Sequence, residues 1–252
     1  MNPRLFNDVH LRKAILTGVI LVVACCLISQ VMMQVGGGPR DERLDLTDQV
    51  PDDFSGPSVI FEDGFPPFIS SAGAFMPEKL VFNVGMFGGG LIMIFLSFEI
   101  FHRTKPDSSK RKIANGVALC SGILIGFSMM QIVAFPFNTD MMLHIFWAMN
   151  IFWGAQVWIA TLTYARGKID SDIEWRGWKI HKVRWGIFAI AILSFQAMTI
   201  LTAMGMLIES AIFEWTLTFA AEAMMLTFIP ILDASQSPID SDTPSGSDVY
   251  AL

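Results

Sequence analysis

Six long apolar stretches constrain this chain more than any other feature. A helix that crosses a membrane needs about 20 mostly apolar residues. Runs of this kind lie at about residues 14–35, 79–101, 113–135, 141–165, 185–208 and 210–232. Hydrophobic residues make up 53% of the 252-residue chain and charged residues 16%, whereas soluble domains carry about 25% charged residues. We therefore predict an all-α integral membrane protein, a bundle of six transmembrane helices. With a net charge of -6 and no basic domain, the chain is not a nucleic-acid binder.

The distribution of lysine and arginine predicts which way the helices run. Cytoplasmic loops of membrane proteins carry an excess of these residues. Fourteen of the 17 lie in the N-terminal segment and in the second and fourth connections. The other three, Arg40, Arg43 and Lys79, lie in the first connection or at its end. We therefore predict that both termini are cytoplasmic, which agrees with an even number of spans.

The segments outside the apolar runs complete the predicted organisation. Residues 1–13 form a cytoplasmic N-terminal segment, and residues 14–232 form one membrane domain. Residues 36–78 form a long acidic loop on the outer side. Residues 233–252 contain no lysine or arginine and are rich in Ser, Asp and Pro, a composition typical of disorder. Glycines four residues apart on the second and third spans favour close helix packing inside the bundle.

Two acidic residues interrupt the sixth apolar run. Glu222 lies near its middle, and Glu214 and Thr218 precede it by eight and four residues, so all three share one helix face. A carboxylate in hydrocarbon is costly and normally faces the bundle interior or a wet cavity. One interpretation is a polar path or lipid-headgroup site. The other is a protonated Glu222 hydrogen-bonded to a neighbouring helix, with Gln131 and Gln196 as candidate partners.

A second group of polar residues is expected at the outer mouth of the bundle. His144 and Asp140 lie at the outer start of the fourth span, and Glu78 lies at the outer start of the second. Their spacing matches no metal-binding motif, and we expect no metal and no cofactor. The chain contains no nucleophile elbow, P-loop or HExxH sequence.

Several short motifs resemble the Frag1/DRAM/Sfk1 family, which includes the N-terminal part of the CWH43 proteins and PGAP2-like proteins. The outer loop ends in Pro67-Phe68-Ile69-Ser70, followed by Gly73, Pro77-Glu78 and Phe82. The resemblance continues in residues 116–131, in His144-Ile145-Phe146-Trp147-Ala148 with Phe152, and in Glu214-Trp215 followed by Glu222. It extends over roughly residues 10–232. The longer acidic first loop and the acidic tail depart from the family pattern.

The resemblance implies six spans with cytoplasmic termini and a role in membrane lipid handling. Members of this family are linked to lysosomes and autophagy, phosphoinositide regulation, lipid asymmetry and GPI-anchor remodelling. It implies no settled catalytic mechanism. It also implies that the signature positions gather at the outer mouth. Together with Asp140, they form the predicted outer-mouth site: Ser70, Glu78, Asp140, His144, Glu214 and Trp215.

Three functions remain open on this sequence. The first is a non-enzymatic lipid-handling, regulatory or scaffold factor. The second is a lipid-remodelling transferase or hydrolase that uses Glu78, Glu214 and His144, with His144 as general base. The third is a proton-coupled carrier that uses Glu222. We expect membrane lipids as partners, with another membrane protein or a second copy as further candidates. The protein would reside in the plasma membrane or in an endomembrane such as that of the lysosome.

Overall fold

Six long helices build the molecule. The structure is a computed structural model that describes residues 7–54, 56 and 58–236, with the backbone alone described for residues 233–236. The long helices are α1 (Asp8–Gly36), α2 (Glu78–Arg103), α3 (Ser109–Ala134), α4 (Met141–Arg166), α5 (Ile180–Ala203) and α6 (Leu207–Leu226). Each is long and apolar enough to cross a membrane, α6 together with the residues up to Leu232. The prediction of a six-helix membrane bundle is confirmed.

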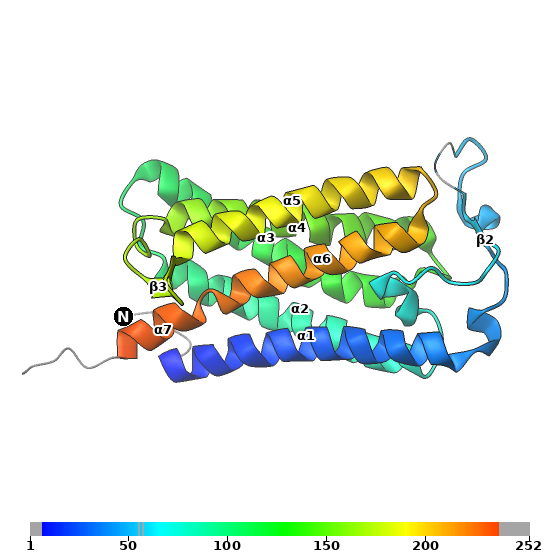
Figure 1. Ribbon diagram of the computed structural model, residues 1–252, viewed down its shortest axis with the longest axis horizontal. Helices are drawn as coiled ribbons and strands as arrows, with labels where there is room; N and C mark the ends of the chain where they lie inside the picture. Colours follow the sequence, from blue (N-terminus) through cyan, green and yellow to red (C-terminus); the bar gives the residue numbers. More distant parts are fainter. Residues whose placement is uncertain (1–6, 55, 57, 237–252) are drawn as a thin grey trace, which may run out of the picture.

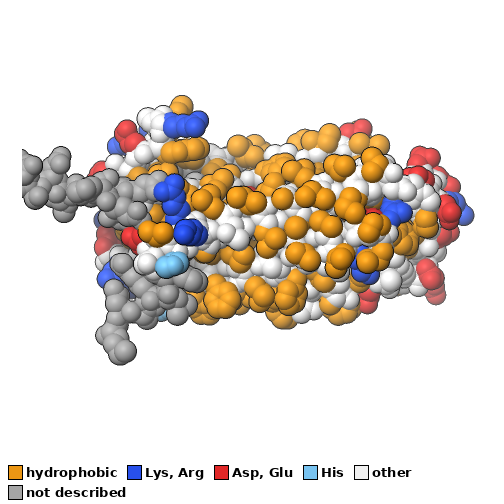
Figure 2. Space-filling view, turned by 90° about the horizontal axis from the view of Figure 1, so that it is seen from below, with side chains coloured by type: hydrophobic (Ala, Val, Ile, Leu, Met, Phe, Trp, Pro, Cys, Tyr) orange, Lys and Arg blue, Asp and Glu red, His pale blue; other side chains and the backbone are white. Residues whose placement is uncertain are grey.

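Successive long helices run antiparallel along the long axis of the molecule, which is horizontal in Figure 1. Helices α1, α2, α3 and α4 pack in sequence order, and α5 and α6 form a closely packed pair. Helix α6 packs mainly on α5 and touches α1 and α4 less extensively. Hydrophobic side chains cover the middle of the surface, and charged side chains gather toward its two ends (Figure 2). This pattern is the one that a bilayer requires.

Short elements occupy the connections at both ends. The long first connection contains η1 (Gly38–Arg40), β1 (Leu44–Asp45), η2 (Thr47–Gln49), β2 (Ile60–Phe61) and η3 (Ile69–Gly73), and its two strands pair antiparallel. The α4–α5 connection carries the antiparallel strands β3 (Glu174–Trp175) and β4 (Trp178–Lys179). We call the end with residues 37–77 the loop end. The opposite end, where α1 begins, is the basic end.

Several helix boundaries differ from the prediction: α1 begins at Asp8, six residues before the predicted span, and α3 begins at Ser109, four residues before it. Helix α5 begins at Ile180, five residues before the predicted span. The sixth span is divided, because α6 ends at Leu226 and a short helix α7 (Ile229–Gln236) follows. Pro230 accounts for the break, because its ring would clash with the carbonyl group four residues earlier in a continuous helix and it has no N–H to donate to that group. The predicted disordered tail therefore begins with helical residues up to Gln236, and its remainder, residues 237–252, lies outside the described residues.

Glycines allow three successive helix pairs to approach closely, and between α2 and α3 the two backbones meet. On α2, Gly85 and Gly89 face Cys25 and Val22 of α1. A Cβ atom added to Gly90 would lie 2.5 Å from the carbonyl oxygen of Gly126 on α3. A Cβ atom on Gly154 of α4 would lie 2.9 Å from a side-chain carbon of Ile125 on α3. The predicted use of the glycine pairs on the second and third spans in internal packing is confirmed, because a Cβ atom on any of these four glycines would lie within 3 Å of a neighbouring helix. Small residues are the usual means by which membrane helices approach closely.

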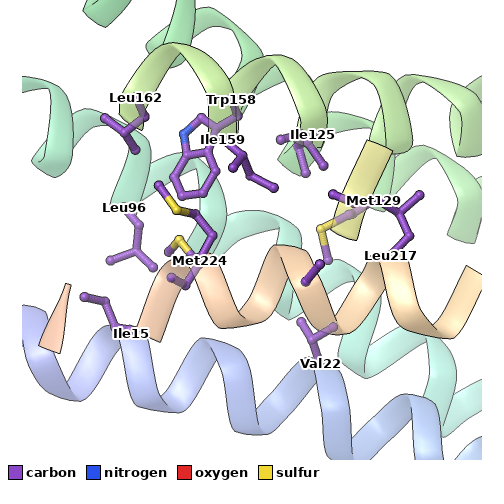
Figure 3. Packing of buried hydrophobic residues seen from close by; sticks show 14 of the residues in the cluster. Ile15, Val22, Leu96, Ile125, Met129, Trp158, Ile159, Leu162, Leu217 and Met224 are labelled. Atoms are coloured by element: carbon purple, nitrogen blue, oxygen red, sulfur yellow. The ribbon is translucent and has the colours of Figure 1, made fainter. Parts of the chain in front are cut away.

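The apolar core lies between the long helices. The side chains labelled in Figure 3 come from α1, α2, α3, α4 and α6 and point toward one another. Helix α5 adds Ala191, Phe195 and Met198 to the same cluster, so all six long helices contribute. Fully buried members include Ile15, Leu96, Ile159 and Met224. Methionines contribute strongly, and their flexible side chains adapt to irregular gaps. The core therefore continues along most of the bundle axis.

A buried ionic cluster fixes the basic end. Asp170, in the α4–α5 connection, accepts two 2.7 Å hydrogen bonds from Arg166 and one of 2.6 Å from Arg184. Arg166 also donates to Thr104 after α2, and Arg184 donates to Thr227 after α6. Burial alone would raise the pKa of the Asp170 carboxyl, but the hydrogen bonds and charges of Arg166, and then of Arg184, hold that pKa below its usual range. One carboxylate thus ties four helix ends together.

The contact between α2 and α3 gives a first prediction. Gly126→Ala should destabilise the protein by about 1–3 kcal/mol, because the added methyl group enters a close backbone contact. Gly116→Ala on the same helix meets nothing within 4 Å and should be neutral or stabilising, since alanine is the better helix former. Thermal unfolding in detergent measures both. Equal effects of the two substitutions would contradict this account of the packing.

The cluster at the basic end gives a second prediction. Asp170→Asn leaves two buried guanidinium groups without their anion and should cost about 3–5 kcal/mol at pH 7. Because the folded pKa is depressed, the contribution is complete above about pH 4 and is lost as the pH falls below that value. The difference from wild type should therefore narrow in acid. Asp107→Asn is the control, because Asp107 forms an exposed ion pair with Lys168 and should have a much smaller effect at any pH.

Candidate functional site

Glu78 forms a bidentate ion pair with Arg40 at the loop end. Its oxygens accept hydrogen bonds of 2.5 Å from Nε and 2.8 Å from Nη2, and the Glu78 side chain is 1% exposed. Arg40 also donates to the carbonyl oxygens of Gly37 and Met76. The hydrogen bond to Glu78 raises the pKa of Arg40 above its ordinary value. Since Arg40 follows α1 and Glu78 begins α2, the pair closes the neck of the long loop.

Glu214 and Trp215 hold the end of the long loop against α6. The backbone N–H of Ile69 donates a 2.8 Å hydrogen bond to Oε2 of Glu214. The indole N–H of Trp215 donates to the carbonyl oxygen of Pro67 at 3.4 Å. Two of the motifs that carry the family resemblance are therefore in direct contact, although about 145 residues separate them. This contact places η3 over the bundle at the loop end.

His144 lies in the first turn of α4, next to the α3–α4 turn. Its Nδ1 forms a 2.8 Å hydrogen bond with the carbonyl oxygen of Phe135, and its ring meets the ring of Phe137 edge-on. The side chain is 2% exposed, and Nε2 is buried without a hydrogen-bond partner. Asp140 caps the start of α4 by accepting from the N–H of Leu143. Both residues thus serve the local geometry of this turn.

The long loop also reaches the α3–α4 turn through one glutamine. The Gln49 amide donates to the carbonyl oxygen of Asn138 at 2.9 Å and accepts from the N–H of Met141 at 2.9 Å. Apolar side chains support this contact, since Phe65 and Phe137 pack in the same cluster with Met33. The loop is therefore packed onto the end of the bundle.

The structure places the six predicted outer-mouth residues at one end but in three separate arrangements. Glu78 pairs with Arg40, Asp140 and His144 stabilise the α3–α4 turn, and Glu214 and Trp215 bind the residues next to Ser70. The Nδ1 of His144 is bound to a backbone carbonyl, so neither carboxylate orients it for base catalysis. In the part of the chain that is described, no group of three His, Cys, Asp or Glu residues is placed to hold a metal ion.

An elongated cavity of about 110 Å³ lies inside the bundle, below η3. It is bordered by α1, α2, α3, α4 and α6, and almost all of its lining side chains are apolar. On α6 the lining extends from Glu214 to Met225, which corresponds to about 17 Å of helix. Ser70 of η3 borders it at the loop end. Its volume is of the order of an engineered 150 Å³ cavity that binds benzene.

Glu214, Thr218 and Glu222 all line this cavity, so they do share one face of α6. No hydrogen bond joins Glu222 to Gln131 or Gln196, and Gln196 is exposed on α5. Sequence reasoning placed the acids on one face but missed the cavity in front of them. It also missed Arg40 as the partner of Glu78, although Arg40 is one of only three basic residues predicted on that side.

The Arg40–Glu78 pair gives a third prediction. Glu78→Gln leaves a buried guanidinium without its anion, so the neck of the long loop should open more often. Amide hydrogen exchange in residues 37–77 should then become at least about tenfold faster, which corresponds to about 1.4 kcal/mol. Arg43→Ala removes an exposed pair in the same loop and should leave exchange unchanged. Unchanged exchange in Glu78→Gln would show that the pair does not hold the loop.

Comparison with known proteins places the chain in a family. The model of the Frag1/DRAM/Sfk1/Cwh43P N-terminal domain matches residues 52–232. Searches of curated proteins and of solved structures gave no match. The matched region begins in the long loop, after α1, and includes η3, the α3–α4 turn and the acidic face of α6. The family match and the six apolar helices together identify an integral multi-pass membrane protein that belongs to the Frag1/DRAM/Sfk1/Cwh43P N-terminal domain family.

Proposed function

We propose that this protein is a non-enzymatic lipid-handling factor that holds part of one hydrocarbon chain of a membrane lipid in its internal cavity. The observation that carries the proposal is the shape and lining of the cavity. It runs along the helix axes, is bordered by five membrane-crossing helices and is lined almost entirely by apolar side chains. A single chain fits such an elongated space better than a fused ring system does.

The arrangement of α6 supports access from the membrane. Helix α6 packs extensively on α5 but less on α1 and α4, and the cavity lies between α6 and these two helices. Val19 of α1 and Ala221 of α6 both line it. A lipid chain that enters between α1 and α6 would bring its polar end near Ser70 and Glu214, at the loop end. We place that end on the outer side of the membrane, as the distribution of lysine and arginine predicts.

The enzymatic alternative has less support. General base catalysis by His144 needs a ring nitrogen that can reach the substrate and a group that orients the ring. His144 is buried outside the cavity lining, and its Nδ1 is bound to Phe135. The carrier alternative rests on Glu222 alone, because the buried charges at the basic end are held in fixed ion pairs between Asp170, Arg166 and Arg184.

Native mass spectrometry of the purified protein tests the proposal. The wild type should retain at least one lipid after gentle release from detergent. Ala221→Phe places a ring in the cavity and should abolish retention. Ile212→Phe is the matched control on the same helix, because Ile212 is 59% exposed on the outer surface, and this variant should retain lipid as the wild type does.

Two outcomes would contradict the proposal. A wild type that carries no specific lipid would favour a role through a protein partner. Retention that persists in Ala221→Phe would show that the lipid binds elsewhere. Circular dichroism and thermal unfolding confirm that each variant is folded before its lipid content is compared.

A further inference from the structure

Three polar groups of α6 face the cavity without a protein partner. Glu214 uses Oε2 for the N–H of Ile69, and no hydrogen bond engages its Oε1, although the residue is only 7% exposed. Glu222 has no hydrogen bond to any residue that the structure describes. Thr218 also lacks the bond to its own helix that Thr199 and Thr216 make. None of their unpartnered oxygen atoms is fully buried, and all three side chains line the cavity.

The positions of these groups match a bound amphiphile. Glu214, Thr218 and Glu222 follow one another at intervals of four residues, so they form a polar line about 12 Å long on one wall. Glu214 lies beside Ser70 at the loop end, and Glu222 lies deeper. Polar groups in the hydrocarbon region are costly unless they find a partner, and they normally face the bundle interior or a wet cavity. A ligand with hydrogen-bonding groups along this wall supplies such partners.

The charge of the lining restricts the ligand. Among the described residues that line the cavity there are two acids and no lysine, arginine or histidine. Arg40, at the same end of the bundle, is already bound to Glu78 through Nε and Nη2 and to the carbonyl oxygen of Gly37 through Nη1. A phosphate or carboxylate group would therefore meet carboxyl groups and no cation. The cavity is unsuited to an anionic headgroup.

An uncharged hydroxyl or amide group suits the lining best. It can donate to a carboxylate, and it can both donate to and accept from a protonated carboxyl or a threonine hydroxyl. An ammonium group would pair with a carboxylate, but its desolvation among apolar side chains is expensive. A hydrogen-bonded hydroxyl is far less costly to bury.

We propose that the cavity selects an uncharged, single-chain amphiphile, or the chain of a lipid with an uncharged headgroup, whose hydroxyl or amide groups bind Glu214, Thr218 and Glu222. This inference rests on the proposed function, because it assumes that the chain occupies the cavity. It adds the class of headgroup that the same site accepts.

Three probes with matched oleoyl-length chains test the selection. Monooleoylglycerol is uncharged, oleoyl lysophosphatidate adds one phosphate to the same skeleton, and oleylamine carries an ammonium group. Native mass spectrometry of the full-length protein, titrated with each probe in detergent, gives relative affinities. Monooleoylglycerol should bind at least about tenfold more tightly than each of the charged probes.

Variants of α6 assign the selection to these side chains. The double variant Glu214→Gln/Glu222→Gln keeps the shape of the two side chains and removes their charge. The preference for monooleoylglycerol over lysophosphatidate should then fall below about threefold. Glu222→Leu removes a hydrogen-bonding group and should weaken monooleoylglycerol binding about fivefold to tenfold. Glu209→Gln changes an exposed acid on the same helix and should change neither quantity.

The outcomes separate this inference from the proposed function. Equal or tighter binding of lysophosphatidate or oleylamine, lost in Ala221→Phe, would overturn the headgroup selection while supporting a chain in the cavity. A preference that persists unchanged in Glu214→Gln/Glu222→Gln would also overturn it. Binding of all three probes that Ala221→Phe does not affect would contradict the proposed function itself.

Discussion

Close backbone contact between α2 and its neighbours is the constraint on which the rest of the bundle depends. Water is absent from the bilayer core, so helix association there relies on packing and interhelical hydrogen bonds. Gly85 and Gly89 bring α1 against α2, and Gly90 and Gly126 bring α2 against α3. Glycines thus hold α1, α2 and α3 close together, whereas α6 packs on the other side of the core with longer side chains such as Leu217 and Met225. The cavity lies where these two kinds of packing meet.

Charged residues fasten the two ends of this bundle in the same way. At the basic end Asp170 joins Arg166 and Arg184, and at the loop end Glu78 joins Arg40. Each carboxylate is almost fully buried. It compensates the charge of arginine side chains that would be costly to bury without an anion. The charges at both ends of the bundle thus hold its connections in place, whereas the acids that face the cavity have no cation among the residues that line it. This contrast is what distinguishes the functional candidates, Glu214 and Glu222, from the structural acids.

Much of the fold was predictable because its signals are local. The length of each apolar run indicates a membrane span, and four-residue spacing places Glu214, Thr218 and Glu222 on one face. The predictions failed where a distant partner decides the outcome. Arg184 was counted as a loop cation, but it is buried in α5 and bound to Asp170, 14 residues earlier in the chain. Gln196 was a candidate partner of Glu222, but the packing of α5 turns it outward.

The sequence by itself determined the six membrane helices, the glycine faces that pack and the membership of the family, because hydrophobic length, small-residue spacing and short motifs are properties of neighbouring residues. Only the tertiary structure decided that Arg40 neutralises Glu78, that Ile69 meets Glu214, and that an apolar cavity lies before Glu222. These relations join residues up to 145 positions apart. These contacts follow from the order and spacing of the helices around a common axis, which no local sequence pattern encodes.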